Sequence, residues 1–209
     1  MKKCFLLIAL SFFLASCKTL NVTEVNGKGA VAVEKSAKAE KVLKTQLDKP
    51  VLANADFEAQ DTGEKGKIKG WQFMQHAGPE SYEFALDRDI FYRGTQSLRI
   101  KNIGEEPYGL AEQKISATAL RGKKVALSAW IKTQETNGRG AGLSMRATRG
   151  GAIAAYNFME SELIRGSQDW RRYTISLEIP ESATALEIGF MLQGSGIAWI
   201  DDVEWAILP

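Results

Sequence analysis

The sequence predicts an all-β protein, with a single β-sandwich that follows an N-terminal leader and a linker. Near the end of the chain, Tyr173, Ile175, Leu177 and Ile179 alternate with polar residues, which is the period of a half-buried strand. Turn-forming residues separate such runs at intervals of about 8 to 12 residues. No segment of the 209 residues has a long helical period. Together these observations favour two packed β-sheets.

Residues 1–16 have the pattern of a secretion signal. Lys2 and Lys3 precede an apolar run that is too short to cross a bilayer, which needs about 20 residues. The following residues, L-A-S-C, resemble the lipobox of bacterial lipoproteins. The resemblance implies that residues 1–16 are removed and that Cys17 carries a lipid such as palmitate, which anchors the chain to a membrane of the cell envelope. The alternative is an ordinary signal peptide with an unrelated cysteine.

The residue after the cleavage site bears on localisation. Lys18 is not the aspartate that resembles an inner-membrane retention signal. In a bacterium with two membranes, it therefore indicates the outer membrane. Residues 17–49 are expected to form a flexible tether, because residues 18–49 contain no aromatic residue and hold seven lysines against four acids.

Composition excludes several classes of function. Cys4 leaves with the signal and Cys17 is used for the lipid, so no cysteine remains for a disulfide or a metal site. The single histidine, His76, excludes a His-rich zinc site. The net charge of +2 equals the charge of Lys2 and Lys3, so the mature chain is neutral. A nucleic-acid binder usually has a basic domain, so nucleic acid is not expected as a partner.

Residues 50–209 have a suitable size for one domain with a single core. The Asn137-Gly138 dipeptide predicts a hairpin between two of its strands. The expected strands are 51–58, 71–74, 82–86, 97–100, 110–115, 124–133, 142–147, 173–179, 186–192 and 197–207.

Four motifs occur in order along this domain: A-N-A-D-F-E, G-W-Q-F, R-G-T-Q-S-L-R-I and I-A-W-I-D-D-V-E-W. They resemble the carbohydrate-binding modules of families 4 and 9, which are jelly rolls of the galactose-binding-like fold. Other segments, among them A-G-L-S-M-R, resemble an uncharacterised branch of this fold that occurs in bacterial regulators and beside hydrolases. That branch usually carries F-D-N-M, whereas this chain has Tyr156-Asn157-Phe158-Met159.

The resemblance implies one structural calcium ion between the first and last strands. Calcium takes six to eight oxygen ligands. By position in the motifs, Glu58 and Asp202 would supply carboxylates, and carbonyl groups near Gly94 and Thr95 would complete the shell. The alternative is that the two carboxylates pair with nearby arginine or lysine and no ion binds.

Ligand binding in such a sandwich relies on exposed aromatic residues with polar neighbours. Trp130 lies opposite an apolar strand face, which makes it one stacking platform, and Tyr108 is a second. The resemblance places further residues over the same concave sheet. The expected ligand-binding residues are Trp130, Tyr108, Gln113, Lys132, Arg146 and Tyr156.

Catalytic arrangements are largely excluded. A Ser-His-Asp triad needs a histidine base, and His76 lies in a turn-like segment. Adjacent acids such as Glu105 and Glu106 read as solvated loop residues. The sequence therefore predicts a lipid-anchored, non-catalytic module that binds a carbohydrate or another cell-envelope polymer. The alternative is a protein-interaction subunit of an envelope complex, or an accessory to a partner hydrolase.

Overall fold

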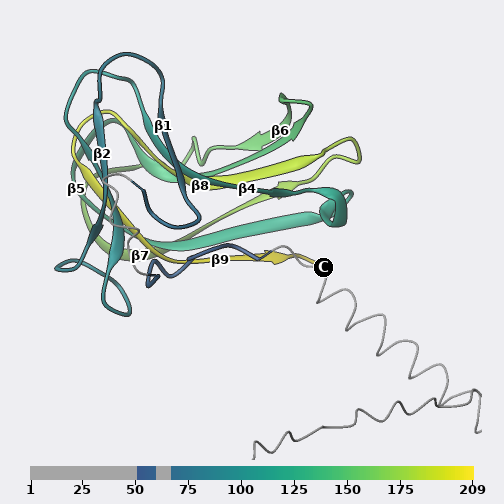
Figure 1. Ribbon diagram of the computed structural model, residues 1–209, viewed down its shortest axis with the longest axis horizontal. Coiled ribbons are helices and arrows are strands. Elements are labelled where there is room, and N and C mark those ends of the chain that lie inside the picture. Colours follow the sequence, from purple (N-terminus) through teal and green to yellow (C-terminus); the bar gives the residue numbers. More distant parts are fainter. Residues whose placement is uncertain (1–50, 60–66) are drawn as a thin grey trace, which may run out of the picture. The chain divides into compact units, whose positions relative to one another are not determined.

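The structure is a computed structural model that describes residues 51–59 and 67–209 (Figure 1). The chain divides into two units, 1–47 and 48–209, and the described residues belong to the second. The predicted signal, Cys17 and the tether lie outside the described residues. Within 51–59 and 67–209, no helix has the length and apolar composition needed to span a membrane.

The described part of the chain is almost entirely β-structure, as the sequence predicts. One short 3₁₀ helix, η1 (Thr118–Leu120), joins two of the strands. The strands are β1 (Gln72–Gln75), β2 (Tyr82–Asp87), β3 (Ser97–Asn102), β4 (Gly109–Ser116), β5 (Lys124–Arg149), β6 (Ala152–Asn157), β7 (Ile164–Glu178), β8 (Ala185–Gln193) and β9 (Ile197–Ile207).

Two layers of antiparallel strands share the long strand β5. Its first half pairs with β7 on one side and with β9 on the other, and β3 and β2 continue that layer. Its second half pairs with β8 and β6, and β4 and β1 continue the other layer. In Figure 1, β8, β4 and β6 lie above β9. The structure is thus the expected β-sandwich.

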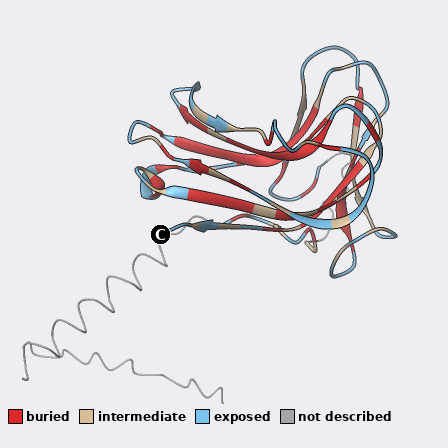
Figure 2. Cartoon of the chain, turned by 180° about the vertical axis from the view of Figure 1, so that it is seen from behind, coloured by how far each residue is buried: buried red, intermediate tan, exposed pale blue. Residues whose placement is uncertain are grey.

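One core lies between the two layers. Leu127 and Ile131 from the first half of β5, and Leu143 and Met145 from its second half, are fully buried in the same cluster. Phe190 of β8 belongs to it as well. Figure 2 shows this buried interior along the facing strands. Since alternate residues of a strand point to opposite sides, the residues between these core positions face outward.

The hairpin predicted at Asn137-Gly138 is wrong, because β5 continues through these residues as one strand. The backbone N–H of Asn137 donates a hydrogen bond to the Ser195 carbonyl, 3.1 Å away, in the loop between β8 and β9. Glu135, Gly138 and Gly140 have positive φ angles, and the pairing of β5 with β7 shifts register three times along its length. These irregularities bend the strand from one layer into the other without reversing it.

The strand predicted at 51–58 is also wrong. Asn54 and Phe57 have φ angles of 48° and 58°, outside the range of a β-strand. The segment forms turns, and Phe57 is fully buried with its ring stacked on Trp71 at 5.1 Å. The Trp71 indole N–H donates to the Asn54 carbonyl. The apolar residues that suggested a strand instead cap one end of the core.

Candidate functional site

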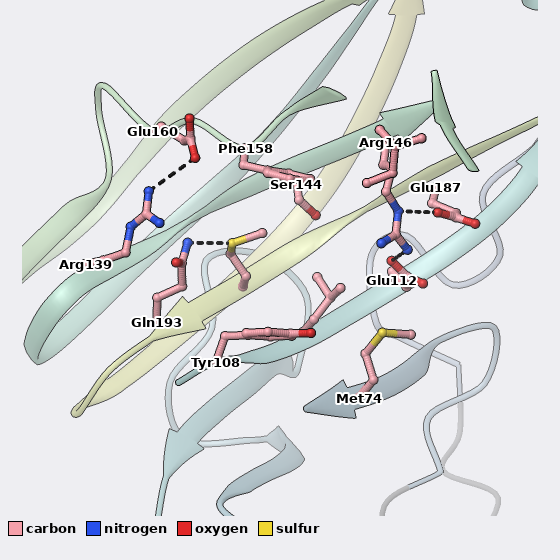
Figure 3. Close-up of a pocket in the computed structure, with 13 residues that line it drawn as sticks. Met74, Tyr108, Glu112, Arg139, Ser144, Arg146, Phe158, Glu160, Glu187 and Gln193 are labelled. Carbon is pink, nitrogen blue, oxygen red and sulfur yellow. Dashed lines mark hydrogen bonds and ion pairs between the residues drawn. The ribbon is translucent and has the colours of Figure 1, made fainter. Parts of the chain in front are cut away.

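A cavity of about 380 Å³ opens on the outer surface of the layer that contains β4, β8 and the second half of β5 (Figure 3). We call this cavity the pocket. It is lined by Met74, Tyr108, Leu110, Glu112, Arg139, Ser144, Arg146, Ile153, Phe158, Glu160, Glu187, Met191 and Gln193.

The floor of the pocket follows from strand pairing. Leu110 of β4 lies opposite Met191 of β8, and Ser144 of β5 lies opposite Gly189. A Cβ atom at Gly189 would lie 2.2 Å from the Ala111 carbonyl oxygen and 2.9 Å from the Glu112 Cβ. Any side chain at this position would therefore collide with β4, so the glycine allows β8 and β4 to approach closely beneath the pocket.

Two aromatic rings form walls on opposite sides of the pocket. Tyr108 precedes β4 and Phe158 follows β6, and Figure 3 shows the two rings facing each other across the opening. Tyr156 stacks on Phe158 with a centroid separation of 4.8 Å and an interplanar angle of 26°. This contact supports one wall. The His76 ring lies edge-on to Tyr108, at 6.3 Å, beside the other wall.

A charged network occupies one end of the pocket. The Arg146 Nε donates to Glu187 at 2.5 Å, and an Arg146 Nη lies 3.5 Å from Glu112. Lys114 approaches the other oxygen of Glu187 at 3.4 Å. Glu112 and Glu187 are only 6% and 8% exposed. Burial raises the pKa of Glu112, and the nearby Arg146 charge opposes that rise.

The opposite end is closed by uncharged and paired groups. Arg139 forms an ion pair with Glu160 at 3.2 Å, which ties β5 to the loop after β6. The Gln193 side-chain amide donates to the Met191 sulfur at 2.8 Å. The pocket therefore offers aromatic faces between the Arg146 network at one end and an ion pair with a neutral amide at the other.

Two of the residues expected to bind ligand, Tyr108 and Arg146, line this pocket. Tyr156 lies on β6 directly opposite Arg146 in the strand register, is 54% exposed, and contacts the pocket through Phe158. These three predictions fall on one surface. The expectation that all six residues share that surface is wrong.

Trp130 and Lys132 lie on the outer surface of the other layer, on the first half of β5. Trp130 stacks on Tyr92 with ring centroids 3.8 Å apart and 12° between the planes, and Trp170 lies 6.1 Å from Tyr92. We call Tyr92, Trp130 and Trp170 the outer aromatic cluster. Lys132 forms an ion pair with Asp169 at 2.8 Å beside it.

Gln113 faces the interior and does not reach the pocket. Its side-chain oxygen accepts from the Ala53 N–H at 2.9 Å, and its amide donates to the Ala53 carbonyl at 2.7 Å. It is 5% exposed. The Gln113 side chain therefore holds the 51–59 segment in place through the two backbone groups of Ala53. Its predicted role in ligand binding is wrong.

The residues expected to hold calcium gather around the loop between β2 and β3. Glu58 accepts hydrogen bonds from the backbone N–H groups of Thr95 and Gln96 and from the Thr95 hydroxyl, and these bonds lower its pKa. A Cβ at Gly94 would lie 2.3 Å from the Glu58 Oε1. Asp202 pairs instead with Arg93 at 3.2 Å.

The atoms expected to bind calcium are carboxylate and carbonyl oxygens, which are the ligands that calcium takes in proteins. Each carboxylate already has a protein partner, however, so an ion would have to replace those contacts. Among residues 51–59 and 67–209, no three histidine, cysteine or acidic side chains gather as a metal site. The calcium site remains a prediction.

Sequence reasoning missed several residues of the pocket. Phe158 is marked in the sequence only as a departure from a family motif, and nothing in the local pattern distinguishes Glu112 or Met191. The alternation of β8 does contain a usable signal, because Leu186 to Leu192 point inward at every second position. The intervening residues, Glu187, Gly189, Met191 and Gln193, must then share the outer surface. What the sequence lacked was the identity of the neighbouring strands.

Comparison with known proteins agrees with this fold. A family model described as a carbohydrate binding domain matches residues 49–196. An uncharacterized HTH-type transcriptional regulator, YbfP of Bacillus subtilis (strain 168), is 29% identical over 143 residues. That match covers 66% of this chain but only 47% of the regulator, so the chain spans about half the length of that relative.

The fold is similar to those of several solved structures, and two of them serve as examples. The first is the enzymatically active domain of tailspike protein 4 from bacteriophage CBA120, with a TM-score of 0.55 and 18% identity over 75% of this chain and 21% of that one. The second is the CBM22-1 xylan-binding domain of Paenibacillus barcinonensis Xyn10C, with a TM-score of 0.51 and 15% identity over 69% of this chain and 89% of that one. At such identities the likeness concerns the fold alone.

Proposed function

This chain belongs to the carbohydrate binding domain family, and from that premise we propose that it is a non-catalytic module whose pocket holds a glycan. The observation that carries the proposal is the placement of Tyr108 and Phe158 on opposite walls of a cavity with a polar network at one end (Figure 3). Membership of the family supports carbohydrate binding. The choice of this pocket rests on its geometry.

The chemistry of a sugar ring suits these walls. Each pyranose has C–H groups on its faces, which pack against flat aromatic rings, and hydroxyl groups around its edge. A hydroxyl both donates and accepts hydrogen bonds, so it can bind a guanidinium and a carboxylate together. Arg146, Glu112 and Glu187 provide such a combination at one end of the pocket.

Arg139 and Arg146 of the lining oppose Glu112, Glu160 and Glu187, and Lys114 just outside the lining balances the third acid when all are ionised. Arg146 and Lys114 face Glu112 and Glu187, and Arg139 faces Glu160. A neutral glycan is therefore favoured over a polymer of acidic sugars, which would require an excess of positive charge. Membership of the family also favours a binding role without chemistry.

The lipid anchor at Cys17 belongs to the same proposal and rests on the L-A-S-C motif alone. A cavity of this size makes few contacts, so each binding event should be weak. Tethering to the outer membrane would raise the effective concentration of the module near an envelope polymer. Palmitate labelling of cells that express the chain tests the anchor. Cys17→Ala should abolish the label, and a labelled Cys17→Ala protein would exclude the anchor.

The experiment that tests glycan binding is a calorimetric titration of the full chain, in detergent, against a panel of soluble oligosaccharides and against purified peptidoglycan fragments. Tyr108→Ala should weaken any binding that is found. The matched control is Phe91→Ala, since Phe91 is an exposed aromatic residue in the loop between β2 and β3 and does not line the pocket. Absence of binding across the panel would remove the support for this function.

A protein partner is the second candidate, and the outer aromatic cluster favours it. Tyr92, Trp130 and Trp170 are partly exposed on the layer opposite the pocket, with Arg93 near the Tyr92 ring. Aromatic residues and arginine are enriched at protein interfaces. Crosslinking in intact cells should then recover one partner in stoichiometric amount, and Trp130→Ala should abolish the crosslink while Tyr108→Ala should not.

A further inference from the structure

The pocket contains apolar side chains that aromatic stacking does not require. Besides Tyr108 and Phe158, it is lined by Met74, Leu110 and Met191. Leu110 and Met191 lie opposite each other on the floor and are 7% and 8% exposed. Flexible thioether and branched side chains do not offer a flat surface to a sugar ring. They suit a compact apolar group, such as a methyl, that enters the floor of the pocket.

A weakly used hydrogen-bond donor lies beside this apolar floor. The Gln193 amide donates to the Met191 sulfur, and a thioether is a poor acceptor. A ligand carbonyl at the same place would accept that hydrogen bond more strongly. Figure 3 shows Gln193 at the end of the pocket opposite Arg146, with Tyr108 between them.

The acceptors lie toward the other end. Glu112 and Glu187 are carboxylates, and Glu187 precedes Gln193 by six residues of strand, or about 20 Å. Long side chains from both ends shorten the free span to that of a short oligosaccharide. A trans amide directs its carbonyl and its N–H in opposite directions. An acetamido group therefore offers its carbonyl to the Gln193 amide and its methyl to the apolar floor, while the hydroxyls of the glycan extend toward the carboxylates at the other end.

We propose that the pocket selects glycans that contain an N-acetylated amino sugar, with the acetamido group at Met191 and Gln193. This inference rests on the proposed function and names its substrate class. A methyl group alone, as in a 6-deoxy sugar, leaves the Gln193 amide with its thioether partner. A plain hydroxyl leaves the apolar floor unfilled. The acetamido group uses both features.

The test compares two disaccharides of the same linkage in calorimetric titrations of the full chain in detergent: N,N′-diacetylchitobiose and cellobiose. One added hydrogen bond and one buried methyl group should give diacetylchitobiose an affinity about tenfold higher. Gln193→Leu should reduce the ratio of the two dissociation constants to about three or less, through loss of the amide donor. Gln168→Leu, on the exposed part of β7, is the matched control and should keep the ratio of the unmodified chain.

The outcomes separate this inference from the proposed function. Equal affinities, or tighter binding of cellobiose, overturn the inference while glycan binding stands. A preference that Gln193→Leu leaves intact also overturns it. No binding of either sugar overturns the inference, and the proposed function falls with it only if the full oligosaccharide and peptidoglycan panel also shows no binding. Sedimentation with insoluble chitin and with purified peptidoglycan then shows which natural source of the amino sugar is bound.

Discussion

Replacing Arg146 by methionine should destabilise the domain, because Glu112 and Glu187 then lose their ion pairs with the guanidinium. The methionine keeps most of the apolar stem but leaves Glu112 without its nearest cation. Removing one partner of a fully buried ion pair costs about 3–5 kcal/mol. The Arg146 side chain is 29% exposed, and Lys114 still contacts Glu187. We therefore expect a loss of about 2 kcal/mol in the free energy of unfolding at pH 8.

The loss should depend on pH, with a sign fixed by Glu112. Burial already raises the pKa of this group in the folded protein, and removing the Arg146 charge raises that pKa further. An acid with a raised pKa stabilises the folded state fully below its unfolded pKa, and this contribution is lost as the pH rises through the folded pKa. The difference between the two proteins should therefore be small near pH 4 and largest above neutral pH.

Urea denaturation of both proteins at several pH values measures this difference. At pH 8 the thermal midpoint should also fall by about 4–8 °C, for a domain of this size. Arg172→Met is the matched control, because its partner Glu204 is exposed, and an exposed pair contributes at most about 1 kcal/mol. An unchanged free energy of unfolding for Arg146→Met, or an equal loss at pH 4 and pH 8, would refute this account of the network.

Four further results are expected. Tyr108→Ala should weaken oligosaccharide binding about two- to twelvefold in calorimetry, because one stacking wall is lost, and an unchanged affinity would contradict the pocket. Trp130→Ala should lower the thermal midpoint, because Tyr92 loses its stacking partner. It should leave oligosaccharide affinity unchanged, and a loss would contradict the assignment of the two surfaces. Gln113→Ala should cost about 1–3 kcal/mol in urea denaturation, because the Ala53 N–H and carbonyl lose their partners; a neutral result would argue that water replaces the side chain. Calcium at a hundredfold excess over its dissociation constant should add about 2.7 kcal/mol, or about 5–11 °C in thermal midpoint, through Glu58 and Asp202, and identical midpoints in calcium and in EDTA would exclude the site.

The sequence carried enough information for the architecture because sandwich strands repeat one local rule. Alternation along 173–179 and 186–192 identified β7 and β8, and the closing strand 197–207 matches β9. The rule failed where backbone geometry outweighed pattern. Residues 51–58 have a sequence that suits a strand, yet positive φ angles at Asn54 and Phe57 turn the chain. Such angles depend on contacts with distant residues, here Trp71 and Gln113, which no local pattern contains.

Only part of the site could be predicted, because the rest of it also depends on contacts between distant residues. Tyr108 and Arg146 were identified from residue type and family position, and both line the pocket. Glu112 and Glu187 read as ordinary strand residues, because a charge next to an apolar neighbour is typical of any half-buried strand. Their burial is a property of the pairing of β4, β8 and β5. Strand order is long-range information, which a single sequence with short-range periodicity does not provide.

The separation of Trp130 from Arg146 shows how such long-range geometry decides a binding surface. Both residues occupy outward positions of the same strand, β5, and are sixteen residues apart. The inward positions of both halves of β5 face one core, since Leu127 and Leu143 belong to the same cluster. A strand that passes from one layer of a sandwich to the other keeps its inward side on that core. Its outward side must then turn onto opposite surfaces of the domain. Trp130 and Arg146 therefore cannot contact one small ligand, and a pair of functions on this domain, one on each surface, is compatible with its fold.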